Sequence, residues 1–236
     1  MIKQHNRVAF VAGATGFVGQ ALVAELARTG WKTVAHVRAD SSKLSVWESD
    51  FAAFGASTSS AAWTPAGMRE ALAECRAHAV FCCIGTTKKR MDLAGSSANS
   101  YETVDFGLAK LLAEAAAAAG GVACFVYVSS AGTSPSSRGA YLQWRWRAEE
   151  AVRAAGVPYV IARPSVITGE RSEARPLEHV AGTVLDGLLG VAGLLGAKLL
   201  RDRYRSTDAT TLARALARLA DDRQALNKTI ESELLH

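Results

Sequence analysis

Short, wholly apolar runs alternate with amphipathic segments along the first two thirds of the chain. Such runs are typical of strands that are buried on both faces of a parallel sheet, and their spacing suits the helices of βαβ crossovers. The runs predict strands at 8–12, 33–37, 79–84, 123–128 and 159–162. The amphipathic patterns predict helices at 18–29, 68–75, 99–119 and 140–155, and a short helix with Trp47, Phe51 and Phe54 in the Ser-rich stretch 39–62.

This alternation predicts an α/β fold with a doubly wound parallel sheet, the Rossmann architecture. The length of 236 residues suits one large domain, and we find no repeat or linker that would divide the chain. We therefore expect residues 1–236 to form a single domain. Its small, mostly helical C-terminal portion, residues 164–236, is expected to lie on the substrate side.

The net charge of +5 arises from 27 Lys and Arg against 22 Asp and Glu. The basic residues are scattered and are not interleaved with aromatic ones, so we expect no nucleic-acid partner. A mildly basic surface instead favours an anionic ligand.

The four cysteines form no CxxC pair and no Cys/His cluster with metal-ligand spacing, so we predict no metal site. They are interpreted as small core residues with reduced thiols. The polar residues 1–7 give no sign of a secretory signal. Together these features predict a cytoplasmic protein, with the mitochondrial matrix as the alternative.

Residues 180–200 form a mostly apolar stretch that is long enough to cross a bilayer. Asp186, Lys198 and several glycines argue against a membrane span, because a charge near the bilayer centre is costly. We favour an apolar lid or a wall of a substrate pocket. Peripheral contact with a membrane or a protein is the alternative.

A turn with three glycines, GATGFVG at 13–19, follows the first predicted strand and opens the first predicted helix. Glycines let a backbone approach a pyrophosphate closely, and a helix N-terminus offers free N–H groups with a partial positive charge. The turn therefore predicts an NAD(P)-binding Rossmann domain. We assign to the cofactor site the residues Gly13, Ala14, Thr15, Gly16, Phe17, Val18 and Gly19.

The nucleotide preference is indicated by the residue that follows the second predicted strand. An NAD-selective protein usually has an acidic residue there for the ribose 2′-hydroxyl, whereas Arg38 suits a 2′-phosphate. Lys43 would add a second positive charge, while Asp40 argues mildly against this assignment. We predict that NADP(H) is favoured over NAD(H).

Small and hydroxylated residues follow the strand predicted at 79–84, at the edge where a parallel sheet presents its ligand. Gly85, Thr86 and Thr87 would let the cofactor pass close to the backbone there. Around 61–64 we find no Asp of the kind that many such proteins place near the adenine. The sequence therefore assigns no residue to that contact.

Several stretches together carry a resemblance to a known family, namely GATGFVG (13–19), CIGTT (83–87), ETVDF (102–106), YVSSAG (127–132), YLQWR (141–145) and RPSVITGERSEARPLE (163–178). The chain resembles the atypical short-chain dehydrogenases, and most closely the Tat-interacting-protein-like oxidoreductases. The last stretch is specific, because it is long and rich in polar residues that core packing would not select. Beyond residue 178 the resemblance is weak.

The resemblance implies a Ser–Tyr–Lys arrangement for hydride transfer between a nicotinamide and a carbonyl or alcohol. By this resemblance the serine is Ser130, with the adjacent Ser129 as the alternative, and the acid that protonates the forming alkoxide is Tyr141. The loop that meets the nicotinamide corresponds to Pro164, Ser165 and Val166.

One position departs from the family, because Arg145 stands where the family has Lys, four residues after the tyrosine. Positions i and i+4 share one helix face, so the positive charge still reaches the neighbourhood of Tyr141. Arg is planar, keeps its proton and is a poor proton relay. The replacement either tunes catalysis, with Arg145 as a catalytic residue, or marks the loss of catalysis.

Three functions are compatible with these residues. The leading one is an NADP(H)-dependent oxidoreductase that acts on a small carbonyl or alcohol. The second is a catalytically impaired NAD(P)-binding regulatory or structural subunit of a larger assembly. The third, an epimerase or dehydratase, is weaker because the C-terminal portion is small for a sugar-nucleotide domain. The helices predicted at 99–119 and 140–155 could pair in a homodimer.

Overall fold

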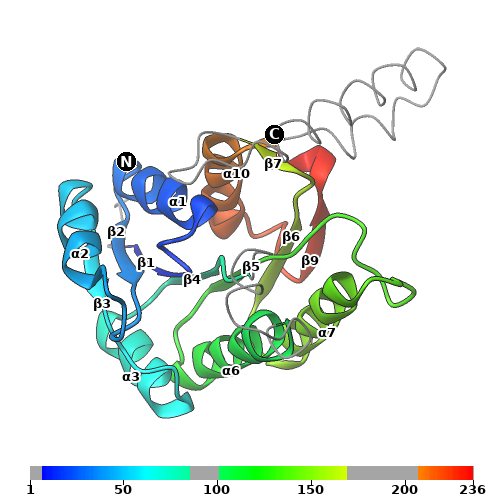
Figure 1. Cartoon of the computed structure of the whole chain (residues 1–236), viewed down its shortest axis with the longest axis horizontal. Helices are drawn as coiled ribbons and strands as arrows, with labels where there is room; N and C mark the ends of the chain where they lie inside the picture. The colour runs from blue at the N-terminus through cyan, green and yellow to red at the C-terminus, as the bar shows by residue number, and fades with distance from the viewer. Residues whose placement is uncertain (1–6, 86–100, 169–206, 236) are drawn as a thin grey trace.

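A seven-stranded, wholly parallel sheet forms the centre of the computed structural model, which describes residues 7–85, 101–168 and 207–235 (Figure 1). The strand order is β3-β2-β1-β4-β5-β6-β9. The order reverses between β1 and β4, and in such sheets ligands bind beyond the carboxyl ends of the strands at this point. The strands are β1 Val8–Ala12, β2 Lys32–His36, β3 Ser57–Ser59, β4 Ala79–Cys82, β5 Cys124–Val128, β6 Tyr159–Arg163 and β9 Lys228–Glu231.

Helices cover both faces of this sheet, so the predicted Rossmann-type α/β class is confirmed (Figure 1). One face carries α1 Phe17–Arg28, α2 Leu44–Ala53 and α10 Ala209–Asp221. The other face carries α3 Pro65–Cys75, α6 Ala109–Ala119 and α7 Ala140–Ala154. The predicted helix at 99–119 is described from residue 101 and begins with a π-helical segment, η1 Tyr101–Leu108, that continues into α6.

The apolar strands divide their side chains between two hydrophobic cores. In β1, Val11 packs into the core under α1 and α10, while Phe10 packs into the core over α3 and α6. Successive side chains of a strand point to opposite faces, so a strand with a helix layer on each side must be apolar throughout. This is the physical reason why the apolar runs identified β1, β4, β5 and β6 from the sequence.

Two strands of the seven-stranded sheet lack such a run, and the apolar pattern identified neither. Strand β3 is short and polar, and it pairs with β2 at the edge of the sheet, with Ser57 opposite Val34. Strand β9 forms the other edge and pairs with β6, and of its four residues only Ile230 is buried. An edge strand is only partly buried, so its sequence carries a weaker hydrophobic signal.

The described part of the C-terminal portion extends the Rossmann layers themselves. Helix α10 packs against α1 and is capped at its N-terminus by Asp208, whose carboxylate accepts a hydrogen bond of 2.9 Å from the backbone N–H of Thr211. A small second sheet pairs β7 Ile167–Thr168 with β8 Thr207–Asp208, and a 3₁₀ turn, η2 Ser232–Leu234, follows β9.

The helices within 7–85, 101–168 and 207–235 are all too short or too polar to cross a membrane. The apolar stretch 180–200, for which the sequence predicts a lid, a pocket wall or a peripheral contact, lies outside the described residues.

Candidate cofactor and active site

Close backbone contacts in the turn at 13–19 require glycine at positions 13 and 19 and leave little room for a side chain at position 16. Gly13 has a φ of +80°, and a Cβ there would lie 2.7 Å from the backbone carbonyl of Cys83, just beyond β4. A Cβ on Gly19 would lie 2.1 Å from the Gly13 carbonyl oxygen, and one on Gly16 would lie 3.2 Å from it. Only glycines therefore allow β1, the end of β4 and the start of α1 to approach this closely.

This turn leaves the N-terminus of α1 suited to an anion. The N-cap residue is Gly16, which has no capping side chain, and the first turn of the helix consists of uncharged residues. Ala14 is buried, and the backbone oxygen of Thr15 accepts a hydrogen bond of 3.0 Å from the Gln20 side chain. Helix N-termini with free N–H groups bind phosphate. The residues thus fit a pyrophosphate, which the cofactor would supply.

Arg38 lies two residues beyond the end of β2, at the edge of the sheet where the glycine turn also lies. Its guanidinium is 3.5 Å from the carboxylate of Asp40, and the two side chains are 63 % and 74 % exposed. Exposed pairs of this kind are weak, so Asp40 would not prevent Arg38 from contacting a 2′-phosphate. Lys43 is exposed and immediately precedes α2.

The sequence has no Asp in the segment 61–64, and in the structure this segment contacts a buried histidine, His36, the last residue of β2. Nε2 of His36 donates a hydrogen bond of 2.8 Å to the backbone oxygen of Ala61. The ring of Trp63 stands edge-on to the His36 ring, with 4.9 Å between the ring centres. Burial lowers the pKa of His36, which favours a neutral imidazole in this aromatic contact.

Gly85 makes room for Arg145, because a Cβ on Gly85 would lie 2.4 Å from Nη2 of that arginine. Thr86 and Thr87, also predicted to lie along the cofactor, are outside the described residues. Arg145 itself is buried, with only 6 % of its side chain exposed. The guanidinium therefore fills the space beside the carboxyl end of β4.

Arg145 holds four elements together through its guanidinium. Nη1 donates hydrogen bonds to the Tyr127 hydroxyl at 3.0 Å, to the backbone oxygen of Val128 at 3.0 Å and to that of Ile84 at 3.2 Å. Nη2 forms an ion pair of 3.0 Å with the buried carboxylate of Asp105. These contacts join α7 to the end of β4, to β5 and to η1.

The electrostatics of this cluster keep the guanidinium charged. Burial opposes the charge, but the carboxylate of Asp105 and the hydrogen bond to the Tyr127 hydroxyl outweigh it and raise the pKa of Arg145. Burial also raises the pKa of Tyr127, so its hydroxyl stays neutral and accepts the hydrogen bond from Arg145. The guanidinium carbon lies 5.3 Å from the centre of the Tyr141 ring, as the i,i+4 spacing predicts.

The structure distinguishes the two candidate serines. Ser129 is buried, and its hydroxyl donates a hydrogen bond of 2.6 Å to Glu149. Ser130 is only partly buried, and its hydroxyl makes a long contact of 3.4 Å with the backbone oxygen of Ala131. The geometry therefore favours Ser130 as the serine that meets a substrate.

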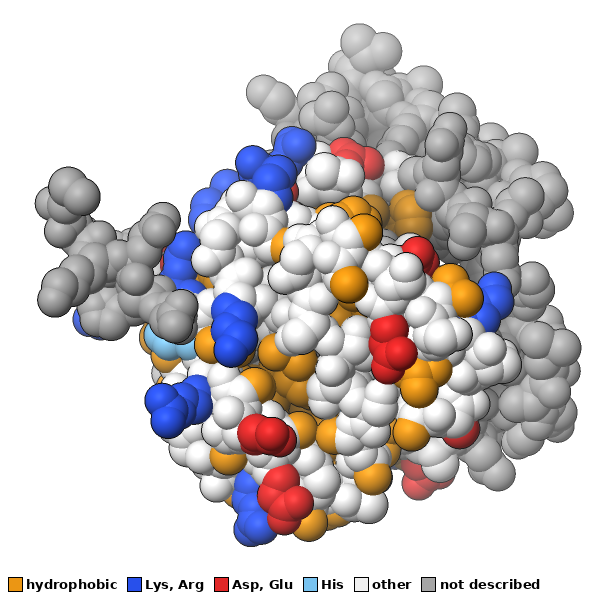
Figure 2. Space-filling view, turned by 90° about the vertical axis from the view of Figure 1, so that its left-hand side faces the viewer, with side chains coloured by type: hydrophobic (Ala, Val, Ile, Leu, Met, Phe, Trp, Pro, Cys, Tyr) orange, Lys and Arg blue, Asp and Glu red, His pale blue; other side chains and the backbone are white. Residues whose placement is uncertain are grey.

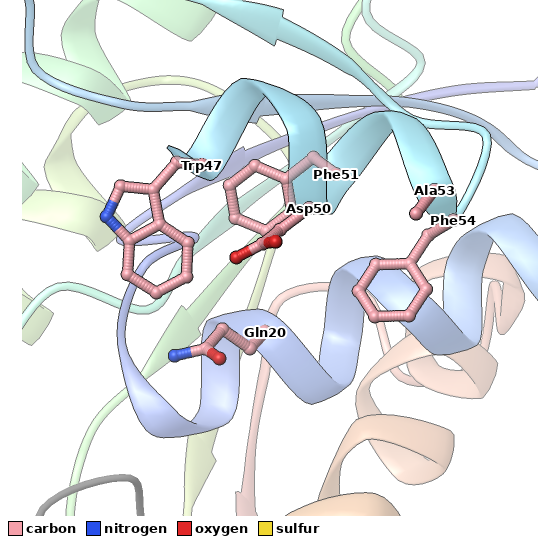
Figure 3. Close-up of a pocket in the computed structure, with 6 residues that line it drawn as sticks. All are labelled: Gln20, Trp47, Asp50, Phe51, Ala53 and Phe54. Carbon is pink, nitrogen blue, oxygen red and sulfur yellow. The ribbon is translucent and has the colours of Figure 1, made fainter. Parts of the chain in front are cut away.

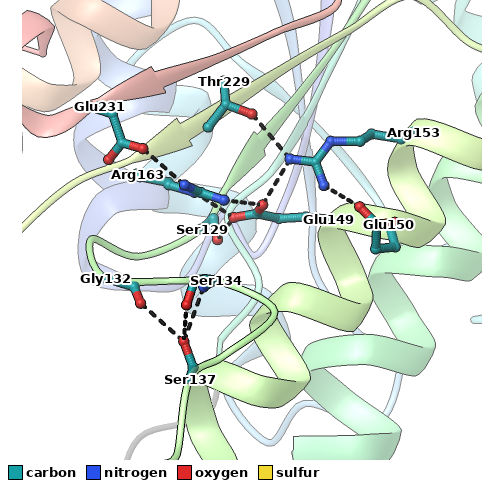
Figure 4. Close-up of polar contacts among 10 residues, drawn as sticks. All are labelled: Ser129, Gly132, Ser134, Ser137, Glu149, Glu150, Arg153, Arg163, Thr229 and Glu231. Atoms are coloured by element: carbon teal, nitrogen blue, oxygen red, sulfur yellow. Dashed lines mark hydrogen bonds and ion pairs between the residues drawn. The ribbon is translucent and has the colours of Figure 1, made fainter.

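Tyr141 lies in the first turn of α7 and is partly buried, with its ring centre 5.6 Å from that of Tyr101. The loop that connects Ser130 to this helix has its own hydrogen bonds, because the Ser137 hydroxyl donates to the Gly132 carbonyl at 3.0 Å and accepts from the Ser134 N–H at 3.0 Å (Figure 4). These hydrogen bonds stabilise the loop between the two candidate catalytic residues.

The loop after β6 is tied to the loop after β5. The backbone oxygen of Pro164 accepts a hydrogen bond of 2.8 Å from Ala131, and the backbone N–H of Ser165 donates to the Ser232 hydroxyl at 3.2 Å. Val166 is 37 % exposed. The structure thus brings the predicted loop 164–166 next to the loop that carries Ser130.

Sequence reasoning missed three polar residues of this region, namely Tyr127, Asp105 and Glu149. All three are buried. Asp105 lies in the quoted stretch ETVDF, and Glu149 follows Tyr141 and Arg145 at a further interval of four residues. A charged residue on the apolar face of a helix is the signal that could have found both carboxylates.

A separate cleft of about 220 Å³ lies between α1 and α2. Its lining residues are Gln20, Trp47, Asp50, Phe51, Ala53 and Phe54, with the aromatic ones on α2 facing α1 (Figure 3). Trp47 and Phe51 stack with their ring centres 5.7 Å apart. On the side of the molecule shown in Figure 2, hydrophobic side chains form small separate groups among charged ones. None of the six lining residues belongs to the predicted cofactor site.

A parallel sheet in this order, with a glycine turn between β1 and the uncapped N-terminus of α1, defines a dinucleotide-binding protein of Rossmann type. The model of a family described as NAD(P)H-binding matches residues 13–187. The chain belongs to this NAD(P)H-binding family.

Two relatives illustrate how far the sequence similarity extends. The mitochondrial protein fmp52 of Aspergillus fumigatus is 37 % identical over 132 residues, which are 56 % of this chain and 52 % of the relative. The chloroplastic protein TIC 62 of Pisum sativum is 30 % identical over 225 residues, which are 86 % of this chain and 41 % of the relative. The matches thus span about half, or less, of these relatives' own length. Their names place them in two different organelles.

Solved structures share the fold at low sequence identity. The UDP-glucose 4-epimerase of Thermotoga maritima has a TM-score of 0.65 at 15 % identity, covering 95 % of this chain and 76 % of the enzyme. The leucoanthocyanidin reductase of Vitis vinifera, solved with NADPH, has a TM-score of 0.64 at 16 % identity, covering 94 % of this chain and 67 % of the enzyme. At this identity the likeness concerns the fold alone.

Proposed function

We propose that this chain is an NADP(H)-dependent oxidoreductase that interconverts a small carbonyl compound and its alcohol. The observation that carries the proposal is the position of Arg145. Its guanidinium contacts both the last residue of β5, two positions before Ser130, and the ring of Tyr141. Two hydroxyl groups are thereby held near the sheet edge that the glycine turn also borders.

In this proposal the bound cofactor supplies the hydride, and the chain supplies orientation and a proton. The hydroxyl of Ser130 donates a hydrogen bond to the carbonyl oxygen of the substrate. As that oxygen gains negative charge, the hydroxyl of Tyr141 transfers its proton to it and leaves an alcohol. Arg145 stays protonated throughout and stabilises the resulting phenolate through space.

The test compares Tyr141→Phe and Ser130→Ala with the wild type, using NADPH oxidation across a broad panel of aldehydes and ketones. General acid catalysis contributes roughly 10² to 10⁴-fold, so we expect kcat to fall by about that factor in Tyr141→Phe while the Kd for NADPH changes little. Tyr159→Phe is the matched control. Tyr159 is the first residue of β6 and therefore lies at the amino ends of the strands, whereas the candidate site lies at their carboxyl ends. Equal turnover in wild type and Tyr141→Phe would remove the tyrosine from the mechanism.

A second candidate function is a cofactor-binding subunit without catalysis. The observation that favours it is again Arg145, whose four oxygen contacts hold it in the interior where the related enzymes have a lysine. Binding of NADPH without turnover on any member of the panel, and no gain in Arg145→Lys, would support this candidate. Copurification in a large assembly would support it further.

The preference for NADP(H) depends on Arg38. We expect Arg38→Ala to weaken the binding of NADPH by roughly 10 to 100-fold, because a charge-assisted contact with the 2′-phosphate is lost. The affinity for NADH should stay unchanged. Isothermal titration of both nucleotides measures this, with Arg69→Ala as the control for an exposed arginine on α3. Similar dissociation constants for NADH and NADPH that do not respond to Arg38→Ala would refute the preference.

The cytoplasmic location, the homodimer and the peripheral contact through 180–200 stay predictions of the sequence. Sedimentation of the purified chain tests the homodimer, and flotation with vesicles tests the membrane contact. The substrate of the proposed oxidoreductase is a small molecule.

A further inference from the structure

A second buried ion cluster lies behind the proposed active site and is centred on Glu149 of α7 (Figure 4). Its carboxylate is fully buried and accepts hydrogen bonds from Ser129 at 2.6 Å, from Nε and Nη2 of Arg163 at 2.9 and 2.7 Å, and from Arg153 at 3.0 Å. We call Ser129, Glu149, Arg153, Arg163 and Glu231 the Glu149 cluster.

The cluster links the carboxyl ends of three neighbouring strands. Ser129 immediately follows β5, Arg163 is the last residue of β6, and Glu231 is the last residue of β9. Arg163 donates to Glu149 with one side of its guanidinium and to Glu231 at 2.8 Å with the other. Within the cluster two carboxylates therefore face two guanidinium groups, and Arg153 also pairs with Glu150 on the exposed side of α7.

The strand ends held in this way are followed at once by the candidate catalytic serine and by the loop proposed to meet the nicotinamide. Ser130 follows Ser129 directly, and Pro164 follows Arg163 directly. The hydrogen bond from Ala131 to Pro164 continues the connection into the two loops. A shift of either strand end would therefore move both the candidate catalytic serine and the loop 164–166.

We infer that Glu149 is a positioning residue, which fixes the two loops after β5 and β6 so that they form the nicotinamide half of the cofactor site. The inference rests on the proposed function. Glu149 acts through Ser129 and Arg163 and does not itself touch the reacting atoms. The adenosine half of the site, with the glycine turn and Arg38, lies at other strand ends and does not depend on the cluster.

The test measures the affinities for two ligands, each of which occupies the adenosine half of the site. NADPH reaches both halves of the site, whereas 2′,5′-ADP reaches only the adenosine half. The variants are Glu149→Gln, which removes the charge, and Ser129→Ala, which removes one hydrogen bond and preserves the ion pairs. Glu150→Gln is the matched control, because Glu150 pairs with the same Arg153 but its side chain is 55 % exposed.

We expect Glu149→Gln and Ser129→Ala to weaken NADPH binding by roughly tenfold or more, since misplaced binding groups lose much of their contribution. The affinity for 2′,5′-ADP should stay within about twofold of the wild type, and Glu150→Gln should change neither value. Unchanged NADPH affinity in both cluster variants would overturn the inference. Equal losses for the two ligands in Ser129→Ala would overturn it as well, because the role would then be general stability.

The same titrations separate this inference from the proposed function. If the wild type binds neither NADPH nor 2′,5′-ADP, the proposed function fails and the inference falls with it. If the wild type binds both and the cluster variants behave alike with both, only the inference fails.

Discussion

We expect Gly19→Ala to abolish nucleotide binding and to destabilise the protein by about 3 kcal/mol or more, because an added methyl group has no space there. The new Cβ would lie 2.1 Å from the Gly13 carbonyl oxygen and 2.8 Å from the Cα of Ala14. Both contacts involve backbone atoms, so no side-chain rotation can relieve them. The turn must open, and its N–H groups then no longer converge on a pyrophosphate.

Fluorescence titration with NADPH and urea denaturation measure the two effects. A graded series provides the controls, because a Cβ on Gly16 would meet the same oxygen at 3.2 Å, whereas one on Gly139 would meet nothing within 4 Å. Affinity should therefore fall little in Gly139→Ala, more in Gly16→Ala and completely in Gly19→Ala. Wild-type affinity in Gly19→Ala would exclude this turn as the pyrophosphate site.

Replacement of the buried Arg145 has the second largest expected effect. Arg145→Met should lower the free energy of unfolding by about 3–5 kcal/mol, because it breaks the buried ion pair between Arg145 and the carboxylate of Asp105. It also removes the donor to the Tyr127 hydroxyl and to the backbone oxygens of Val128 and Ile84. For a chain of this size the loss corresponds to a decrease in Tm of roughly 10 °C.

Thermal and urea denaturation check this result. Arg147→Met on the same helix is the control, because the exposed Arg147 contacts only the face of Trp144 among the interactions described, with 4.2 Å to the ring centre. We expect that variant to lose less than about 1 kcal/mol. A loss of similar size in both variants would contradict the view that Arg145 joins four elements through buried contacts.

The sequence predicted the centre of the sheet better than its edges, and the reason is burial. Strands such as β1 and β5 lie between two helix layers, so their side chains are apolar except for the hydroxyl of Tyr127 in β5. Strand β3 has the sequence Ser57-Thr58-Ser59, and nothing in that pattern distinguishes it from a loop. Its pairing with β2 depends on the fold around it, which local sequence does not encode.

The candidate site likewise has a part that the sequence predicts and a part that it does not. The glycine turn could be predicted because its chemistry is local, with strand, turn and helix adjacent in the chain. The resemblance favoured Ser130 over Ser129, but the physical difference between the two serines depends on Glu149, twenty residues from Ser129 in the sequence. The contacts of Arg145 likewise involve Asp105 and Ile84, which only the folded chain brings together.

The position of β9 has a consequence for the order in which the protein is assembled. Arg163 is synthesised well before Glu231, so the ion pair between them can form only after residue 231 has been made. Until β9 pairs with β6, the backbone N–H and C=O groups on that side of β6 lack strand partners. An exposed strand of this kind can pair with other chains. A nascent chain that stalls before residue 228 would therefore be a substrate for chaperones.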